Sequence, residues 1–175
     1  EKKRVRLPDG SNVTMNSSSE IRYREGFGQV HRDIILEGES LFEVAKDSLI
    51  PFSVKTGKLT TVALGTSFNV KGFSKERITQ VRLISGKVKV ENENDPGFNN
   101  DLFYLTAGEE ALLTPSDFKK TKFNPTKALL WTEGILFFEN TEFSEVITTL
   151  KRWYGVDIAV YGAPEKVKCS GSFNN

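Results

Sequence analysis

The stretch ILEGESLF at residues 35–42 decides the fold class of this chain. It places an apolar residue, two spacers and Gly38 before a second apolar stretch. Glycine adopts the positive φ of a tight turn without steric cost, so the pattern predicts a corner between two short β-segments. A turn is also expected at Gly65, and the full pattern recurs at Leu7/Gly10, Val54/Gly57, Leu83/Gly86 and Leu105/Gly108.

The first two thirds of the chain are therefore predicted to be all-β. Alternating apolar and polar side chains indicate short strands, each close to a Gly, Pro, Asn or Asp break. These strands are expected near residues 13–15, 21–23, 41–44, 52–54, 68–70, 81–83, 88–90 and 111–113. Many short strands joined by polar turns are typical of a sandwich, a barrel or an irregular solenoid.

A different pattern begins after Trp131. Apolar residues at helical spacing predict one amphipathic helix whose apolar side chains share a face. That face comprises Phe143, Val146, Ile147, Leu150 and Trp153. We expect Asn140 or Thr141 to cap the start of this helix and Gly155 to end it.

Strand patterns flank the predicted helix. Residues 136–138 precede it and residues 156–160 alternate after it, which predicts a βαβ unit with a further strand near residues 167–173. Prolines and lysines between the two patterns indicate a connector. The sequence thus predicts an all-β domain at residues 1–114, a connector at 115–130 and a small α/β domain at 131–175.

Several of these motifs resemble the FecR family of periplasmic anti-sigma regulators. The N-terminal ones are LPDGS at 7–11, LEGESLFEV at 36–44, PFSV at 51–54, LGTSFNV at 64–70, SGKVKV at 85–90 and AGEEA at 107–111. The segment from Leu136 to Ile158, with FENT at 138–141 and KRWYG at 151–155, is similar to the small C-terminal domain that often follows. The order and spacing of the motifs are more specific than any one of them.

This resemblance implies a twisted β-solenoid-like scaffold, followed by an incomplete α/β module of the secretin and TonB short N-terminal (STN) type. It implies no cofactor, no metal and no catalytic residues. FecR-type proteins cross the inner membrane once, so the chain is expected to be the periplasmic portion of a longer precursor. The implied partners are the signalling domain of a TonB-dependent outer-membrane transporter and, through a cytoplasmic region absent from this chain, a sigma factor.

The partner surface is expected on the small C-terminal module. Its predicted sheet lacks the strands that would complete it, so the edge at residues 167–173 keeps backbone groups that a partner strand can satisfy. The candidate contact residues are Leu136, Phe138, Val167, Cys169, Gly171 and Phe173.

The charges of the chain nearly cancel, with 24 Lys and Arg against 23 Asp and Glu. Nucleic acid is therefore not the expected partner, because phosphate binding needs a basic excess on one face. The basic runs at residues 2–4 and 119–122 could contact an anionic surface, but they are interpreted as a solvated strand edge or loop. The single cysteine, Cys169, excludes an internal disulfide, and no apolar run reaches the length of a membrane helix.

The sequence shows no catalytic set, so the chain is predicted not to be an enzyme. The KTG run at residues 55–57 and Ser116 with Lys119 match fragments of the penicillin-binding serine signature, but in the wrong order. His31 has no nucleophile or orienting group nearby in the sequence. One histidine and one cysteine are too few for a zinc site.

Three carboxylates leave a carbohydrate-related function open. Glu37, Glu39 and Glu43 alternate along one segment, an arrangement that can pair acids for glycoside hydrolysis. No row of aromatic residues at strand spacing accompanies them to stack a sugar. A carbohydrate-active enzyme is therefore a lesser alternative, and the main alternative to a signalling role is a non-catalytic glycan-binding β-module of the cell envelope.

Overall fold

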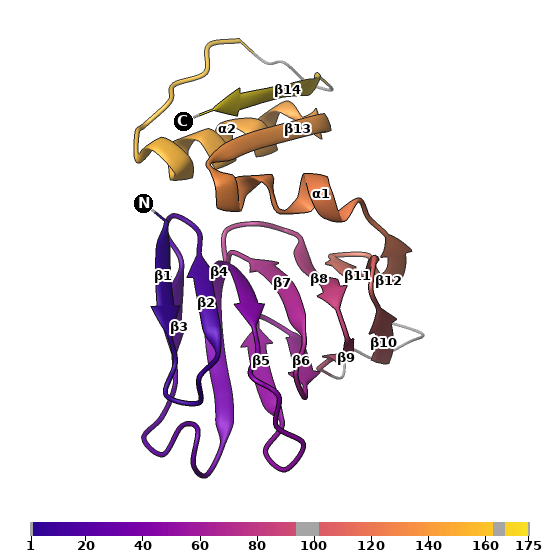
Figure 1. The fold of residues 1–175 in the computed structure, drawn as a ribbon. Coiled ribbons are helices and arrows are strands. Elements are labelled where there is room, and N and C mark those ends of the chain that lie inside the picture. Colours follow the sequence, from indigo (N-terminus) through magenta and orange to yellow (C-terminus); the bar gives the residue numbers. More distant parts are fainter. Residues whose placement is uncertain (1, 94–101, 163–166, 175) are drawn as a thin grey trace. The chain divides into compact units, whose positions relative to one another are not determined.

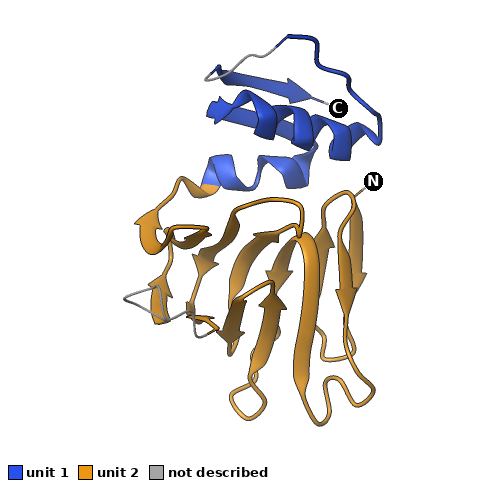
Figure 2. Cartoon of the chain, turned by 180° about the vertical axis from the view of Figure 1, so that it is seen from behind, with its two compact units in different colours: residues 1, 126–175 blue, residues 2–125 orange. Residues whose placement is uncertain are grey.

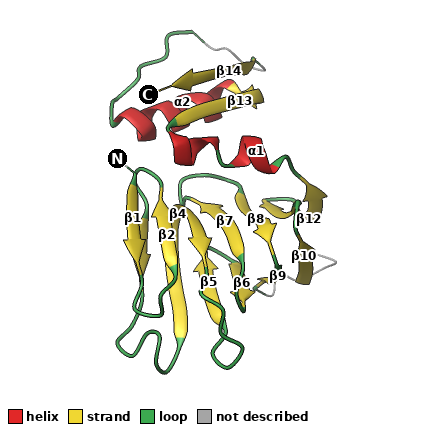
Figure 3. Ribbon diagram, viewed as in Figure 1, coloured by secondary structure: helices red, strands yellow, loops and turns green. Residues whose placement is uncertain are grey.

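The computed structural model of the chain describes residues 2–93, 102–162 and 167–174. They fall into two compact units, one of Lys2–Pro125 and one that contains Thr126–Asn175 (Figure 2). These are termed the β unit and the C-terminal unit. Strands dominate the described residues, and helices occur among them only from Pro125 onward (Figure 3).

The described part of the β unit is a twisted sheet of 12 strands that nearly closes on itself (Figure 1). Its strands are β1 (Lys3–Arg6), β2 (Asn12–Met15), β3 (Glu20–Arg22), β4 (Arg32–Glu43), β5 (Phe52–Thr56), β6 (Leu59–Ala63), β7 (Ser67–Gly72), β8 (Thr79–Ser85), β9 (Lys87–Asn92), β10 (Leu102–Thr106), β11 (Glu109–Thr114) and β12 (Asp117–Lys122).

Strand β4 joins two groups of strands. Its first half pairs with β3 and β5, and β6, β9 and β10 continue from β5 as sheet B. Its second half pairs with β2 and β7, and β1, β8, β11 and β12 complete sheet A. The β4–β5 pairing is parallel and the other pairings between the described strands are antiparallel. This confirms the mainly β prediction but gives no support to a solenoid-like coil.

The change of sheet within β4 takes place at Gly38, which has a φ of +121°. The predicted turn between two strands is wrong at this position, because β4 continues through the glycine, which pairs with Gly72 of β7. A Cβ at Gly38 would lie 2.7 Å from the Cα of Ser19, so only glycine fits this bend. The other predicted corners do lie between strands with positive φ, at Gly10, Gly57, Gly65, Gly86 and Gly108.

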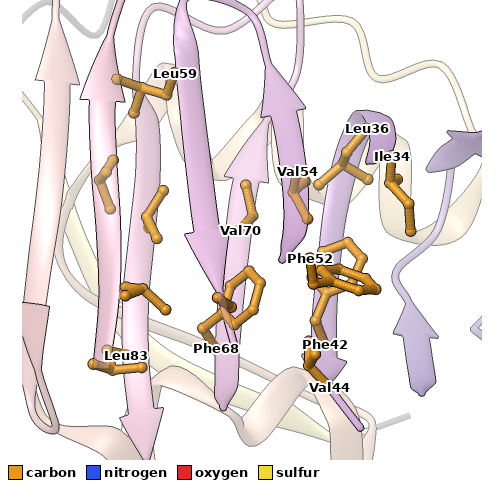
Figure 4. Packing of buried hydrophobic residues seen from close by; sticks show 14 of the residues in the cluster. Ile34, Leu36, Phe42, Val44, Phe52, Val54, Leu59, Phe68, Val70 and Leu83 are labelled. Carbon is orange, nitrogen blue, oxygen red and sulfur yellow. The ribbon is translucent and has the colours of Figure 1, made fainter. Parts of the chain in front are cut away.

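A hydrophobic core lies between the inner faces of sheets A and B (Figure 4). In sheet A, Phe42 stacks on Phe68 with 5.3 Å between ring centroids, and it meets Phe52 of sheet B edge-on at 5.9 Å. Alternate residues point into this core, as in β5, where Phe52 and Val54 are buried and Ser53 is less so. This alternation is the signal that predicted the strands.

A buried arginine organises the start of β4. The side chains of Arg32 and Asp9 are only 1% and 4% exposed, and Arg32 Nη1 lies 3.2 Å from Asp9 Oδ2. The guanidinium also donates hydrogen bonds to the backbone carbonyls of Ala45, Asp47 and Ile50. Both charges are therefore paired and hydrogen-bonded, as burial requires.

Asp9 extends this network into the turn after β1. Its carboxylate accepts hydrogen bonds from the backbone N–H and the hydroxyl of Ser11, at 3.0 and 2.7 Å. The Ser11 hydroxyl oxygen in turn accepts a hydrogen bond from the backbone N–H of Ala45 at 2.9 Å. One ion pair thus connects the β1–β2 turn with the segment between β4 and β5.

Residues 117–122, which the sequence analysis placed in a connector, form strand β12. This strand pairs with β11 at an edge of sheet A, and Phe118 is buried in the core. Its lysines are exposed, and the opposite edge strand β1 is basic as well. The two basic runs therefore lie on sheet edges, where charge discourages edge-to-edge aggregation.

The C-terminal unit contains one antiparallel two-stranded sheet among its described residues. Its elements are α1 (Pro125–Ala128), the 3₁₀ helix η1 (Leu130–Glu133), β13 (Ile135–Glu142), α2 (Phe143–Tyr154) and β14 (Lys168–Asn174).

We predict that Gly38→Ala destabilises the β unit more than Gly108→Ala does. Both glycines have positive φ, which costs a residue with a Cβ about 1–2 kcal/mol. A Cβ at Gly108 meets nothing within 4 Å, whereas one at Gly38 collides with Ser19. Urea denaturation followed by circular dichroism should resolve the difference. Equal losses would contradict the steric role assigned to Gly38.

We also predict that Asp9→Ala lowers the free energy of unfolding by about 3–5 kcal/mol, because it leaves the Arg32 charge buried without its counterion. Glu43→Ala is the matched control, since it breaks the exposed Arg4–Glu43 pair and should cost less than about 1 kcal/mol. The same denaturation measurement applies. Similar losses for the two variants would show that the Arg32–Asp9 pair contributes no more than a surface pair.

Candidate partner-binding surface

The sheet of the C-terminal unit is built on β13. Alternation in this strand buries Leu136 and Phe138, while Asn140 is exposed. The pairing of β13 with β14 shifts register after Phe138, and Asn140 adopts a φ of 51° there. The backbone N–H of Asn140 donates a hydrogen bond of 2.9 Å to the hydroxyl of Ser170 in β14.

Helix α2 packs on this sheet through three of the five residues of the predicted face, and Phe143 and Ile147 are half-buried outside that cluster. Val146 is buried against Leu136 and Phe138, and Leu150 and Trp153 pack partly buried on the same cluster. The predicted cap at Asn140 or Thr141 is wrong, because β13 continues to Glu142 and that residue occupies the N-cap without a side-chain hydrogen bond. Gly155 ends the helix in the left-handed conformation, as predicted.

Strand β14 forms one edge of the sheet. Among the described residues it pairs with β13 and with no other strand. Cys169 packs partly buried on the cluster under α2, whereas the rest of the strand is exposed. Phe173 is 49% exposed although its ring lies edge-on to Phe138, with 6.1 Å between centroids. One side of β14 therefore has no strand partner within the described part of the unit, and an exposed aromatic side chain lies beside it.

The structure divides the six candidate contact residues into two groups. Leu136 and Phe138 are buried beneath α2, so their side chains pack in the core between the sheet and the helix. The other four lie on or next to the exposed edge, and they are Val167, Cys169, Gly171 and Phe173.

Residues 156–160 do not form the predicted strand. The structure assigns no secondary structure to them, and β14 pairs antiparallel with β13, so the described residues contain no βαβ unit. Val156 and Val160 are 49% and 43% exposed. The alternation that predicted this strand is therefore present without the pairing that would bury its apolar face.

The three glutamates considered for glycoside chemistry do not converge. Glu39 is buried, and its carboxylate accepts hydrogen bonds from the amides of Asn16 at 2.8 Å and Asn69 at 3.1 Å. Glu37 accepts a hydrogen bond from the backbone N–H of Ser74, and Glu43 pairs with Arg4. Each carboxylate thus has its own separate partner. This arrangement does not support an acid pair.

The remaining candidates for chemistry are separate as well. His31 Nε2 lies 3.1 Å from the carbonyl of Glu25, and Lys119 lies 3.7 Å from Asp117. No group of three or more His, Cys, Asp or Glu within residues 2–93, 102–162 and 167–174 is placed to hold a metal ion. The described helices include none that is long and apolar enough to cross a membrane.

A pocket of about 380 Å³ lies in the β unit beside the Gly38 bend. Thr56 and Leu113 contribute to its lining, together with the acidic Glu37 and Glu76 and the basic Arg77. Acidic and basic groups are mixed around it, so its lining does not favour one class of ligand.

Sequence reasoning missed the buried role of Arg32. A signal was present, because Arg32, Ile34 and Leu36 occupy alternate positions of one strand and therefore point to the same face. An arginine in register with two core residues indicates a buried guanidinium that needs a carboxylate partner.

Comparison with known proteins gives consistent matches over both units. The sequence matches the family described as FecR protein over residues 1–89 and the family described as FecR, C-terminal over residues 135–175. No curated protein matches the sequence.

Solved structures are similar over the whole chain. A crystal structure at 1.65 Å resolution of a candidate anti-sigma factor from Parabacteroides distasonis ATCC 8503 shares 30% identity at a TM-score of 0.88. A 2.50 Å crystal structure with the same description shares 30% identity at a TM-score of 0.87. Each comparison covers 100% of this chain and 81% of the other chain.

We predict that Leu150→Ala destabilises the C-terminal unit by about 2 kcal/mol, because it removes apolar contacts with the cluster under α2. Thr148→Ala is the control on the same helix, at an exposed position, and should change the stability by less than about 0.5 kcal/mol. Both tryptophans, Trp131 and Trp153, lie in this unit, so thermal unfolding followed by tryptophan fluorescence reports on it. A Leu150→Ala midpoint equal to that of the parent would contradict this packing.

Proposed function

The chain belongs to the FecR family of anti-sigma factors, and we propose that its C-terminal unit binds the N-terminal signalling domain of a TonB-dependent outer-membrane transporter. A sigma regulator must couple an external state to the activity of a sigma factor. In this proposal the C-terminal unit detects the state of the transporter by binding its signalling domain. The β unit serves as the rigid scaffold that holds it.

The free edge of β14 is the observation that carries this proposal. Among the described residues, the sheet of the C-terminal unit has two strands, and one edge of β14 has no partner. Unpaired backbone N–H and C=O groups along such an edge can be satisfied by a strand from another protein. Exposed Val167 and Phe173 provide apolar side chains next to these groups.

The expected partner is proposed to have a sheet edge that can pair with the edge of β14. By its resemblance to the STN fold, the C-terminal unit is expected to share its architecture with the transporter's signalling domain. Two such sheets can pair edge to edge, so that backbone hydrogen bonds supply the affinity and side chains beside the edge supply the specificity. Val167 and Phe173 are the side chains assigned to specificity here.

The location follows from the same proposal. Both units lie in the periplasm, an inner-membrane segment outside this chain anchors them, and a cytoplasmic region outside this chain contacts the sigma factor. Among the described residues, the three glutamates have separate partners and the pocket has mixed charge, so neither feature supports the enzyme or the glycan-binding alternative.

We predict that Ser170→Pro weakens binding of the cognate transporter's signalling domain at least tenfold, about 1.4 kcal/mol, because proline removes a backbone donor and fixes φ in β14. Ser170→Ala is the matched control. It also removes the hydroxyl that accepts from Asn140 but keeps the backbone N–H. Isothermal titration calorimetry measures both affinities, and tryptophan fluorescence verifies that the unit is folded.

Two outcomes would contradict the proposal. If folded Ser170→Pro binds as tightly as Ser170→Ala, the edge of β14 is not the contact. If binding also survives deletion of residues 131–175, the contact lies on the β unit.

A further inference from the structure

The pocket of about 380 Å³ in the β unit lies where the core between the two sheets ends. A Cβ at Gly72 would collide with Thr56 Cγ2 and would lie 3.1 Å from Thr79 Cγ2, so these two threonines, from sheets B and A, meet over the glycine. Leu113 adds a buried apolar side chain to the lining. The floor of the pocket therefore belongs to the strands of the core, and its volume is that of a small-molecule site.

One polar group in this floor lacks a partner. Thr56 is only 2% exposed, and its buried hydroxyl oxygen has no hydrogen-bond partner among the described residues. A buried hydroxyl without a partner costs free energy, so its presence in a folded core calls for an explanation. Because Thr56 lines the pocket, a molecule bound there can supply the missing hydrogen bond.

The acidic groups of the lining already have partners. The Glu76 carboxylate lies 3.3 Å from Lys71 Nζ, and the two side chains are only 12% and 18% exposed. Glu37 accepts a hydrogen bond of 2.7 Å from a backbone N–H. The hydrogen bonds of Glu20 and, less strongly, the charge of Glu37 raise the pKa of Arg22, so Glu37 also lies in the field of that guanidinium.

Arg77 differs from these acids. Its side chain is exposed in the loop between β7 and β8, and no hydrogen bond or ion pair within the described residues involves it. Lys58 adds a second positive charge to the lining. A guanidinium binds a carboxylate through two parallel hydrogen bonds. Although acidic and basic residues are mixed around the pocket, their pairing therefore favours an anionic ligand.

We propose that this pocket binds a small organic carboxylate. Arg77 holds the carboxylate, Leu113 packs against the apolar body of the ligand, and the Thr56 hydroxyl bonds to a further polar group. An inorganic anion would satisfy Arg77 but would leave Leu113 and Thr56 without a contact. The site lies in the β unit alone and is independent of the transporter contact proposed for the C-terminal unit.

Four probe molecules separate these contributions. Phenylacetate has the carboxylate and an apolar ring, mandelate adds a hydroxyl, phenylacetamide removes the charge, and inorganic phosphate is an anion without an apolar body. An NMR titration of the isotope-labelled chain follows the amide signals of Gly57 and Gly72, which line the pocket. We expect phenylacetate to bind with a Kd of about 1 mM, and phenylacetamide and phosphate to bind at least about tenfold more weakly.

Two results of this titration would overturn the proposal. Absence of shifts with both carboxylates would mean that the pocket does not bind this class of ligand. Equal affinity for phosphate or for phenylacetamide would mean that the site does not select an organic carboxylate.

Arg77→Gln tests the anion contact. We expect it to weaken phenylacetate binding at least about tenfold, because the guanidinium is replaced by an uncharged amide. Arg24→Gln is the matched control, since Arg24 is also an exposed arginine, pairs with Asp33 and does not line the pocket. Unchanged affinity in Arg77→Gln, or equal losses in both variants, would overturn the role of Arg77.

Thr56→Val tests the hydrogen bond in the floor. We expect mandelate to bind the parent chain about tenfold more tightly than phenylacetate, and Thr56→Val to remove this advantage without changing the affinity for phenylacetate. Thr61→Val is the matched control, because the Thr61 hydroxyl is equally buried and unpartnered among the described residues but does not line the pocket. An advantage of mandelate that persists in folded Thr56→Val would overturn the role of Thr56.

Discussion

The buried ion pair between Arg32 and Asp9 is the interaction on which the β unit depends. A guanidinium inside a protein must be paired and hydrogen-bonded, and here a carboxylate and three backbone carbonyls meet that need. These groups come from segments with little regular structure, which have few other reasons to adopt one conformation. Because the buried guanidinium requires all of these partners, Arg32 holds the β1–β2 turn and the segment between β4 and β5 in one conformation.

Local patterns predicted most of the strands because burial on one face imposes a period of two on the sequence. They did so for β5 and β9, where alternate valines and phenylalanines face the core. The same reasoning missed β12, whose lysines occupy a solvated edge and leave only Phe118 as an apolar signal. It also assigned a turn to Gly38, since a positive φ identifies a bend but does not reveal whether pairing continues beyond it.

The candidate surface shows a second limit of local patterns. A strand at residues 167–173 could be predicted, and the structure has β14 at Lys168–Asn174. The absence of pairing at residues 156–160 could not, since a strand requires a partner as well as an alternating sequence.

The continuity of β4 has a consequence for how the β unit opens. A strand that is hydrogen-bonded in both sheets cannot lose its pairs in one sheet while its neighbours in the other remain unaffected, since the backbone on either side of Gly38 is shared. The two sheets are therefore expected to exchange their amide hydrogens as one cooperative block, with edge strands β1 and β12 fraying first.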